Sequence, residues 1–212
     1  MNAPILVLCY LVAAAHLFAC ISYQERARIL TKPLLLPALL VLYLVSVSNP
    51  APLVCTAIFL SFLGDVLLMI KGTGWFIAGA SAFLLSWTTY TVEMVRTSMR
   101  WPAAWLIPII FGTYYALGIL AFLSLRKKMG KTIIPGSIYF LVLSTMGAFS
   151  ATYLSGTLAW TALMMTIGAI LIMISDYLLA YSIFDRRFKQ QDFWIMLTYI
   201  AGEFLIVYSF IY

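Results

Sequence analysis

Apolar stretches recur along the whole of this 212-residue chain, and each is near the ~20 residues that a helix needs to cross a bilayer. Eight of them can be counted, over approximately 4–22, 33–49, 52–70, 75–95, 103–124, 133–154, 157–183 and 192–212. Because 64% of the residues are hydrophobic and only 9% are charged, the chain cannot surround a single core with a polar surface. We therefore predict an all-α polytopic membrane protein, with residues 1–212 forming one transmembrane domain.

Positive charge is confined almost entirely to alternate links between these stretches. Every Lys and Arg except Arg96 and Arg100 lies in or beside the links after the first, third, fifth and seventh stretches. The positive-inside rule predicts that these links are cytoplasmic and that both termini lie outside. We expect a bacterial inner (cytoplasmic) membrane. Topology and contact with anionic headgroups explain the net charge of +6, so it gives no reason to expect a nucleic-acid partner.

Two of the apolar stretches contain an aspartate. Asp65 lies in "FLSFLGDVLLM" and Asp176 in "LIMISDYLLAYSIF". An ionisable side chain within the membrane costs about 2.5–3.5 kcal/mol on insertion scales and by default indicates a functional site. Both stretches run toward the cytoplasmic side, and both aspartates fall within about two turns of its boundary. We therefore expect the two carboxyl groups at a similar depth.

Two further ionisable groups are expected at that depth. Lys32 opens the second stretch from the cytoplasmic side, and His16, the single histidine, lies about one and a half turns above the inner end of the first. Taken alone, Lys32 can snorkel to lipid phosphates, and a lone histidine is more often a satisfied interior group. The aspartates cannot snorkel as far. We expect all four groups to converge, with Lys32 placed to bind a lipid phosphate.

A short internal echo relates the two halves of the chain. "LGDVLLM" and "ISDYLLA" share a small residue before Asp and Leu-Leu after one intervening position, and a Lys/Thr/Pro cluster precedes the second and sixth stretches. A parallel duplication of a four-helix unit, with its axis along the membrane normal, would leave this pattern. Such a duplication would bring Asp65 and Asp176 face to face across a central cavity.

Four segments carry a family resemblance. "TKPLLLPALLVLYL", "SFLGDVLLM", "WFIAGASAFLLSWTTY" and "ISDYLLAYSIF" follow one another over about three quarters of the chain. They resemble the signature segments of the YhhN-type lysoplasmalogenases, which are eight-span integral membrane enzymes. The matching positions are Lys32, Pro33, Ser61, Gly64, Asp65, Gly79, Phe83, Tyr90, Ser175, Asp176 and Ala180. One position departs, because Trp87 stands where family members commonly carry a histidine.

The resemblance implies hydrolysis of the vinyl-ether bond of a lysoplasmalogen, which yields a fatty aldehyde and glycerophosphoethanolamine or glycerophosphocholine. It implies catalysis by Asp65 and Asp176, with Lys32, Ser61, Tyr90 and Ser175 at substrate-binding positions. His16 is a candidate, on depth alone, to replace the imidazole missing at Trp87.

The chemistry suits a pair of carboxyl groups. Protonating the β-carbon of a vinyl ether is the hard step, and it needs a carboxylic acid that is still protonated near neutral pH. Two aspartates in one poorly solvated site can hold one proton between them. The ionised partner can then stabilise the oxocarbenium ion and orient water, as paired carboxylates do around a glycosidic bond. The sequence does not say which aspartate takes which role.

Other protein classes also use buried carboxylates. A proton- or cation-coupled transporter would set them along an ion route, and Glu203 with Tyr199 one turn before it suits that alternative. The clustering of the candidate groups toward one leaflet favours the hydrolase. An intramembrane aspartyl protease needs a second glycine two positions before Gly64, where this chain has Phe62.

No metal or other cofactor is expected, because a lone histidine and scattered carboxylates give no metal-ligand spacing. The expected partners are a lysophospholipid substrate and membrane lipids.

Overall fold

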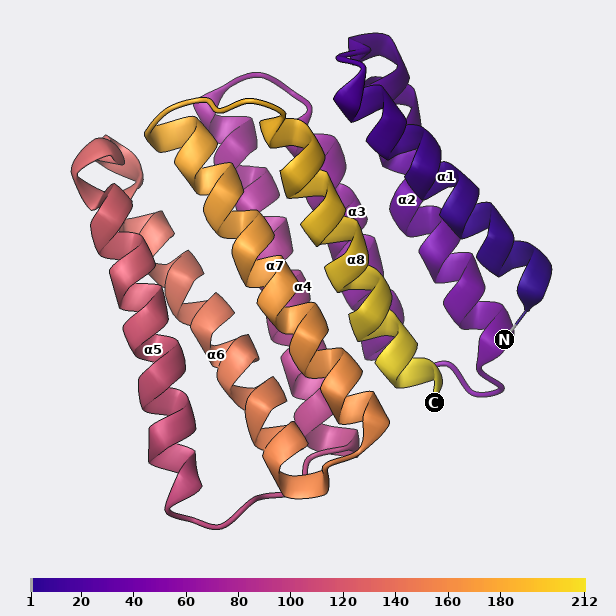
Figure 1. Ribbon diagram of the computed structural model, residues 1–212, viewed down its shortest axis with the longest axis vertical. Helices are drawn as coiled ribbons and strands as arrows, with labels where there is room; N and C mark the ends of the chain where they lie inside the picture. The colour runs from indigo at the N-terminus through magenta and orange to yellow at the C-terminus, as the bar shows by residue number, and fades with distance from the viewer. Residues whose placement is uncertain (1) are drawn as a thin grey trace.

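The computed structural model describes residues 2–212 and folds them into eight α-helices with no β-strand among the described residues (Figure 1). The helices are α1 (Ala3–Ile21), α2 (Glu25–Ser46), α3 (Pro52–Leu68), α4 (Thr73–Thr97), α5 (Leu106–Leu125), α6 (Ile133–Thr157), α7 (Trp160–Phe184) and α8 (Gln191–Ile211). Two short 3-10 turns, η1 (Arg126–Lys128) and η2 (Gly130–Thr132), join α5 to α6. The all-helical prediction is confirmed.

Six of the eight helices are both long enough and apolar enough to cross a membrane. The two that fall outside this group are α3, which has 17 residues, and α4, which is long but carries several Ser and Thr residues. The membrane-protein class is therefore supported, while the count of eight spans stays a prediction. The lipid-facing surface fits this class, because large apolar side chains are exposed along α1, α2 and α5.

The start of α2 corrects one sequence prediction. The second apolar stretch was expected to begin at residue 33 with Lys32 at its entrance, whereas α2 begins at Glu25 and runs through Pro33 and Pro37. Good helix formers precede the first proline, and Glu25 in the first turn favours the positive end of the helix dipole. Lys32 consequently lies about two turns inside α2 and reaches sideways into the bundle.

Two pairs of helices form the centre of the molecule. α3 packs along α4 and α7 along α8, while the α1/α2 and α5/α6 hairpins flank this centre on opposite sides (Figure 1). α2 contacts α8, and α6 contacts α4, so each outer hairpin touches a helix from the other half of the chain. A duplicated four-helix unit would give this pairing, although the duplication itself stays a prediction.

Aromatic side chains fill the space between α4 and α8. The rings of Phe83, Trp87 and Tyr90 stack in turn along α4, with centroids 5.9 and 6.2 Å apart. Tyr90 continues the stack onto Phe210 of α8 at 6.1 Å, and Phe83 meets the edge of Tyr199 at 5.7 Å. These bulky rings hold the two central pairs apart, and that separation leaves room for polar groups at one end.

The links after α1, α3, α5 and α7 lie together at one end of the molecule, uppermost in Figure 1. We call it the basic end because it carries nearly all of the Lys and Arg residues. Ion pairs tie it together: Arg28 of α2 lies 2.7 Å from Asp192 of α8, and Lys128 of η1 pairs with Asp185. Both termini lie at the opposite end (Figure 1).

The close packing of α7 on α8 depends on two glycines. A Cβ on Gly168 would lie 2.9 Å from the carbonyl oxygen of Gly202, and one on Gly202 would lie 3.0 Å from that of Gly168. Because backbone atoms cannot rotate aside, we expect Gly168→Ala or Gly202→Ala to destabilise the fold by about 1–3 kcal/mol. Thermal unfolding in detergent measures this effect.

Gly112 on α5 is the matched control. It is exposed, and its added Cβ would meet nothing within 4 Å, so Gly112→Ala should stabilise by about 0.5–1 kcal/mol. Equal melting temperatures for all three variants would contradict the packing described for α7 and α8.

Candidate active site

A polar cavity of about 540 Å³ lies at the basic end, between α1, α2, α3, α7 and α8. Four ionisable groups predicted to converge all line it, namely His16, Lys32, Asp65 and Asp176. They come from four different helices. The structure thus brings the two aspartates to one cavity, together with the only histidine of the chain.

Asp65 is the more enclosed of the two aspartates and is matched to a cation. Its side chain is almost fully buried, and its Oδ1 lies 3.1 Å from the Lys32 ammonium. The hydroxyl of Tyr199 on α8 donates a hydrogen bond to Oδ2 at 3.1 Å. A buried carboxylate with an ammonium and a hydroxyl donor on its two oxygens has the partners that its ionised form needs.

Asp176 has different partners. Its Oδ2 accepts a hydrogen bond of 2.7 Å from the hydroxyl of Tyr139 on α6. The indole N–H of Trp87 on α4 donates in turn to the oxygen of Tyr139 at 3.4 Å. Within residues 2–212, no Lys or Arg forms an ion pair with Asp176. The two aspartates therefore share one cavity but have unlike electrostatic surroundings.

His16 lines the cavity, and both of its ring nitrogens are engaged. The Thr31 hydroxyl donates to the carbonyl oxygen of Ala27 at 2.7 Å, so it can accept a hydrogen bond from Nδ1 of His16, which lies 2.8 Å away. Nε2 then faces the Cys20 thiol at 3.6 Å. These contacts involve neither aspartate and not Trp87, so the replacement of the missing imidazole by His16 stays a prediction.

The remaining predicted substrate-binding residues divide into two groups. Ser175 lines the cavity, although its hydroxyl donates to the backbone oxygen of Ile195 at 3.0 Å. Ser61 is fully buried 2.8 Å from the hydroxyl of Ser86, and Tyr90 donates to Glu203 at 3.1 Å. Neither Ser61 nor Tyr90 lines the polar cavity, because both side chains face the closed interior between α3, α4 and α8.

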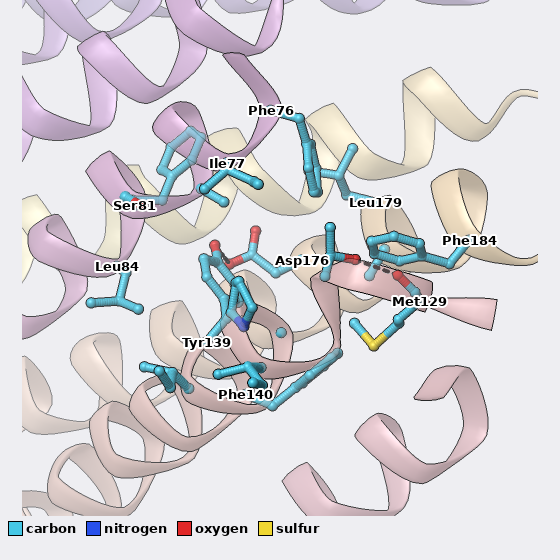
Figure 2. Close-up of a pocket in the computed structure, with 18 of the residues that line it drawn as sticks. Phe76, Ile77, Ser81, Leu84, Met129, Tyr139, Phe140, Asp176, Leu179 and Phe184 are labelled. Atoms are coloured by element: carbon cyan, nitrogen blue, oxygen red, sulfur yellow. Dashed lines mark hydrogen bonds between the residues drawn. The ribbon is translucent and has the colours of Figure 1, made fainter. Parts of the chain in front are cut away.

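A second, apolar space adjoins the cavity. This groove of about 310 Å³ lies between α4, α6 and α7, and Figure 2 shows Phe76, Ile77, Leu84, Phe140 and Leu179 around it. Its outer rim carries exposed apolar side chains of α6, Ile134 and Ile138. The groove therefore faces the hydrocarbon that would surround the bundle.

Asp176 lies where the cavity and the groove meet. Four residues line both spaces: Leu68, Phe83, Asp176 and Leu179. Only Asp176 among them is ionisable, and in Figure 2 the Tyr139 hydroxyl is directed at its carboxyl group. An amphiphile bound across this boundary would put its polar part on one side of Asp176 and its hydrocarbon part on the other.

Sequence reasoning missed Tyr139 and considered Tyr199 only as a neighbour of Glu203, whereas each of these tyrosines hydrogen-bonds an aspartate. Tyr139 and Tyr199 each stand within an apolar helix, and a buried tyrosine hydroxyl normally has a partner. That rule makes both residues candidates for a hydrogen bond to a buried polar group. Which carboxyl group each one meets depends on how α6 and α8 are rotated, and the sequence alone does not give that rotation.

These features define a class: a membrane-type helical bundle whose interior holds an acidic site between a polar and an apolar compartment. The chain belongs to the YhhN family, because the sequence model of that family matches residues 27–210. Membership, predicted from four segments, is thereby confirmed over nearly the whole chain. No match to this chain is found among curated proteins or among solved structures.

Replacing Lys32 should lower the free energy of unfolding, because it leaves a buried, charged Asp65 without its cation. In Lys32→Met the carboxylate keeps one hydroxyl donor and loses its cation, so we expect a loss of about 3–5 kcal/mol in the free energy of unfolding. Adding Asp65→Asn to that variant removes the unpaired charge and should restore most of the loss. Unfolding of the single and double variants in detergent measures the coupling.

Lys71→Met is the control for loss of a positive charge, because Lys71 is exposed beyond the end of α3 and its removal should change stability by less than about 0.5 kcal/mol. Strictly additive effects of the two substitutions at Lys32 and Asp65 would contradict the ion pair.

Proposed function

We propose that this protein is a membrane hydrolase that cleaves the vinyl-ether bond of lysoplasmalogens to a fatty aldehyde and a glycerophospho-alcohol. The observation that carries the proposal is the position of Asp176, at the boundary between a polar cavity and an apolar groove. A lysoplasmalogen has its vinyl ether at the junction of headgroup and chain. Binding with the headgroup in the cavity and the chain in the groove therefore sets the reactive bond beside Asp176.

The cavity offers suitable groups for a zwitterionic headgroup. Lys32, Arg28 and Arg187 line it and can bind a phosphate, while Glu25 and Asp192 can face an amine. By the positive-inside rule the basic end is cytoplasmic, so the substrate would come from the inner leaflet. The groove, open toward lipid, would admit the chain sideways.

The unlike partners of the two aspartates supply an assignment of roles. Asp65 is held ionised by Lys32, whereas Asp176 has only neutral donors and can remain a carboxylic acid. In the proposed reaction Asp176 donates its proton to the β-carbon of the vinyl ether. The resulting positive charge is shared between the α-carbon and the ether oxygen as an oxocarbenium ion.

Water from the polar cavity completes the reaction. The Asp65 carboxylate stabilises the oxocarbenium ion and orients the water that attacks the α-carbon. The proton released by that water returns to Asp176, which restores the acid. The hemiacetal then loses its hydroxyl proton and breaks its bond to the glycerol oxygen, which takes up a proton. The aldehyde leaves into lipid and the alcohol leaves through the cavity.

The direct test is aldehyde release from a lysoplasmalogen by purified protein in detergent. We expect the wild type to release aldehyde and Asp176→Asn to lose at least about 10³-fold in rate, because it lacks the general acid. Asp65→Asn should lose about 10²–10³-fold, as expected when one electrostatic stabiliser is removed.

Glu93→Gln is the matched control, since Glu93 is equally buried but lies away from the cavity, beside Arg96. It should retain wild-type activity. Folded wild-type protein that releases no aldehyde from any vinyl-ether lysolipid would contradict the proposal. It would favour the ion-coupled transporter, for which the enclosed Glu203–Tyr90 pair is the supporting observation and proton flux into liposomes is the assay.

The groove should decide which chains are accepted. Ala80 of α4 lines it, so Ala80→Trp would fill space that the alkenyl chain needs. Displacing two methylenes, at about 0.8 kcal/mol each, should raise KM for a long-chain substrate roughly tenfold. Steady-state kinetics over a chain-length series measures this effect.

Ala13 lines a separate apolar pocket between α1, α2 and α8, and Ala13→Trp is the matched control. A chain-length dependence that changes in the Ala13 variant and not in the Ala80 variant would move the chain site to that other pocket.

A further inference from the structure

We propose that Trp87 and Tyr139 form a fixed donor chain that holds the acidic proton of Asp176 on Oδ1 and supports the carboxylate once that proton has left. Both are positioning residues that act through Asp176. The inference rests on the proposed hydrolase function for its kinetic consequences, while its structural content concerns only these three side chains.

The contact between Trp87 and Tyr139 has a fixed direction. An indole N–H can only donate, so the hydrogen bond of 3.4 Å from Nε1 makes the Tyr139 oxygen its acceptor. Trp87 is fully buried, with its ring stacked against Phe83 and Tyr90. The indole therefore has little freedom to rotate away from Tyr139, and its packing fixes the direction of its N–H group.

The phenolic hydrogen of Tyr139 must then point elsewhere. Its hydrogen bond to Oδ2 of Asp176 is 2.7 Å long, the usual length for a well-formed O–H···O bond. Because Oδ2 already accepts this hydrogen, the carboxylic proton of neutral Asp176 has its place on Oδ1. Within residues 2–212, Oδ1 accepts no hydrogen bond and is not among the enclosed atoms without a partner, so it is the oxygen left for a bound molecule.

The same bond assists proton transfer. When Asp176 gives up its proton, the Tyr139 hydroxyl donates to an ion instead of a neutral acid, and such charge-assisted bonds are about twice as strong. The donor is already aimed at the carboxyl group, so no group has to reorient during the reaction. On Asp65 the corresponding donor is Tyr199, but there Lys32 also neutralises the charge.

Tryptophan at position 87 determines the direction of the hydrogen bonds in this donor chain. A histidine at that position could accept a hydrogen bond as well as donate one, and it could change its charge between pH 5 and 8. Tyr139 could then donate to the imidazole and leave Oδ2 without its hydrogen. Tryptophan removes that alternative and keeps the donor chain in one direction at every pH.

Tyr139→Phe tests the proposal. We expect kcat to fall about 10- to 100-fold with KM nearly unchanged, as for loss of a hydrogen bond to a charged group. We also expect the alkaline limb of the pH–rate profile to move to higher pH, because the carboxylate has lost a donor. Trp87→Phe should move both quantities in the same direction by less, and Trp87→His should add a new titration between pH 5 and 8.

Tyr153→Phe is the matched control, because this tyrosine also lies on α6 and its hydroxyl pairs with Thr161 away from the site. It should leave the pH profile in place. A merely structural role for Tyr139 would reduce the yield of folded protein and its melting temperature without moving the alkaline limb.

A readout that needs no turnover separates this inference from the proposed function. The infrared C=O stretch of protonated Asp176, identified by its loss in Asp176→Asn, should shift to higher frequency in Tyr139→Phe because the carbonyl oxygen loses its donor. An unshifted band together with an unchanged pH profile would overturn the inference. A shifted band in a protein with no hydrolase activity would uphold the donor chain and remove only the proposed reaction.

Discussion

The ion pair between Lys32 and Asp65 gives the two buried aspartates different chemistry. The two carboxyl groups line the same cavity, but within residues 2–212 only that of Asp65 has a cation beside it. Two carboxyl groups in one poorly solvated site favour a single negative charge, and the lysine determines where that charge resides. The proposed roles of acid and stabiliser rest on this difference in partners and not on any difference between the aspartates themselves.

The helix arrangement gives this site a polar cavity on one side and an apolar groove on the other. The aromatic stack along α4 separates the central helix pairs, and the ion pairs at the basic end tie α2 to α3 and α8 around the polar cavity. On the far side of Asp176, α4, α6 and α7 leave an apolar groove toward lipid (Figure 2). One carboxyl group thereby contacts both environments, as a reaction at the junction of headgroup and chain requires.

Much of this arrangement could be predicted from the sequence, because the lengths of the apolar stretches and the positions of the charged residues can be read directly along the chain. These features predicted the helices, the basic end and the convergence of four groups on one cavity, namely His16, Lys32, Asp65 and Asp176. The start of α2 was misjudged, since prolines inside a helix resemble a boundary. Ser61 and Tyr90 line neither the cavity nor the groove, and their contact with a substrate stays a prediction.

The hydrogen-bond partners of the two aspartates could not be predicted from the sequence, for a different reason. Tyr139 meets Asp176, and Tyr199 meets Asp65, through the rotation of α6 and α8 about their axes, which side-chain packing across the bundle determines. Trp87 was noticed only as a departure from the family pattern. Its contact with Tyr139 puts Trp87 two hydrogen bonds away from the carboxyl group of Asp176.

The proposed function requires that a lipid lie across the boundary at Asp176. An experimental structure of the protein bound to a lysolipid with a saturated ether, which lacks the double bond that is protonated, tests it most directly. We expect the phosphate beside Lys32, the chain between α4, α6 and α7, and the ether link next to Asp176. A chain lying in the pocket between α1, α2 and α8, with the ether link remote from both aspartates, would contradict it.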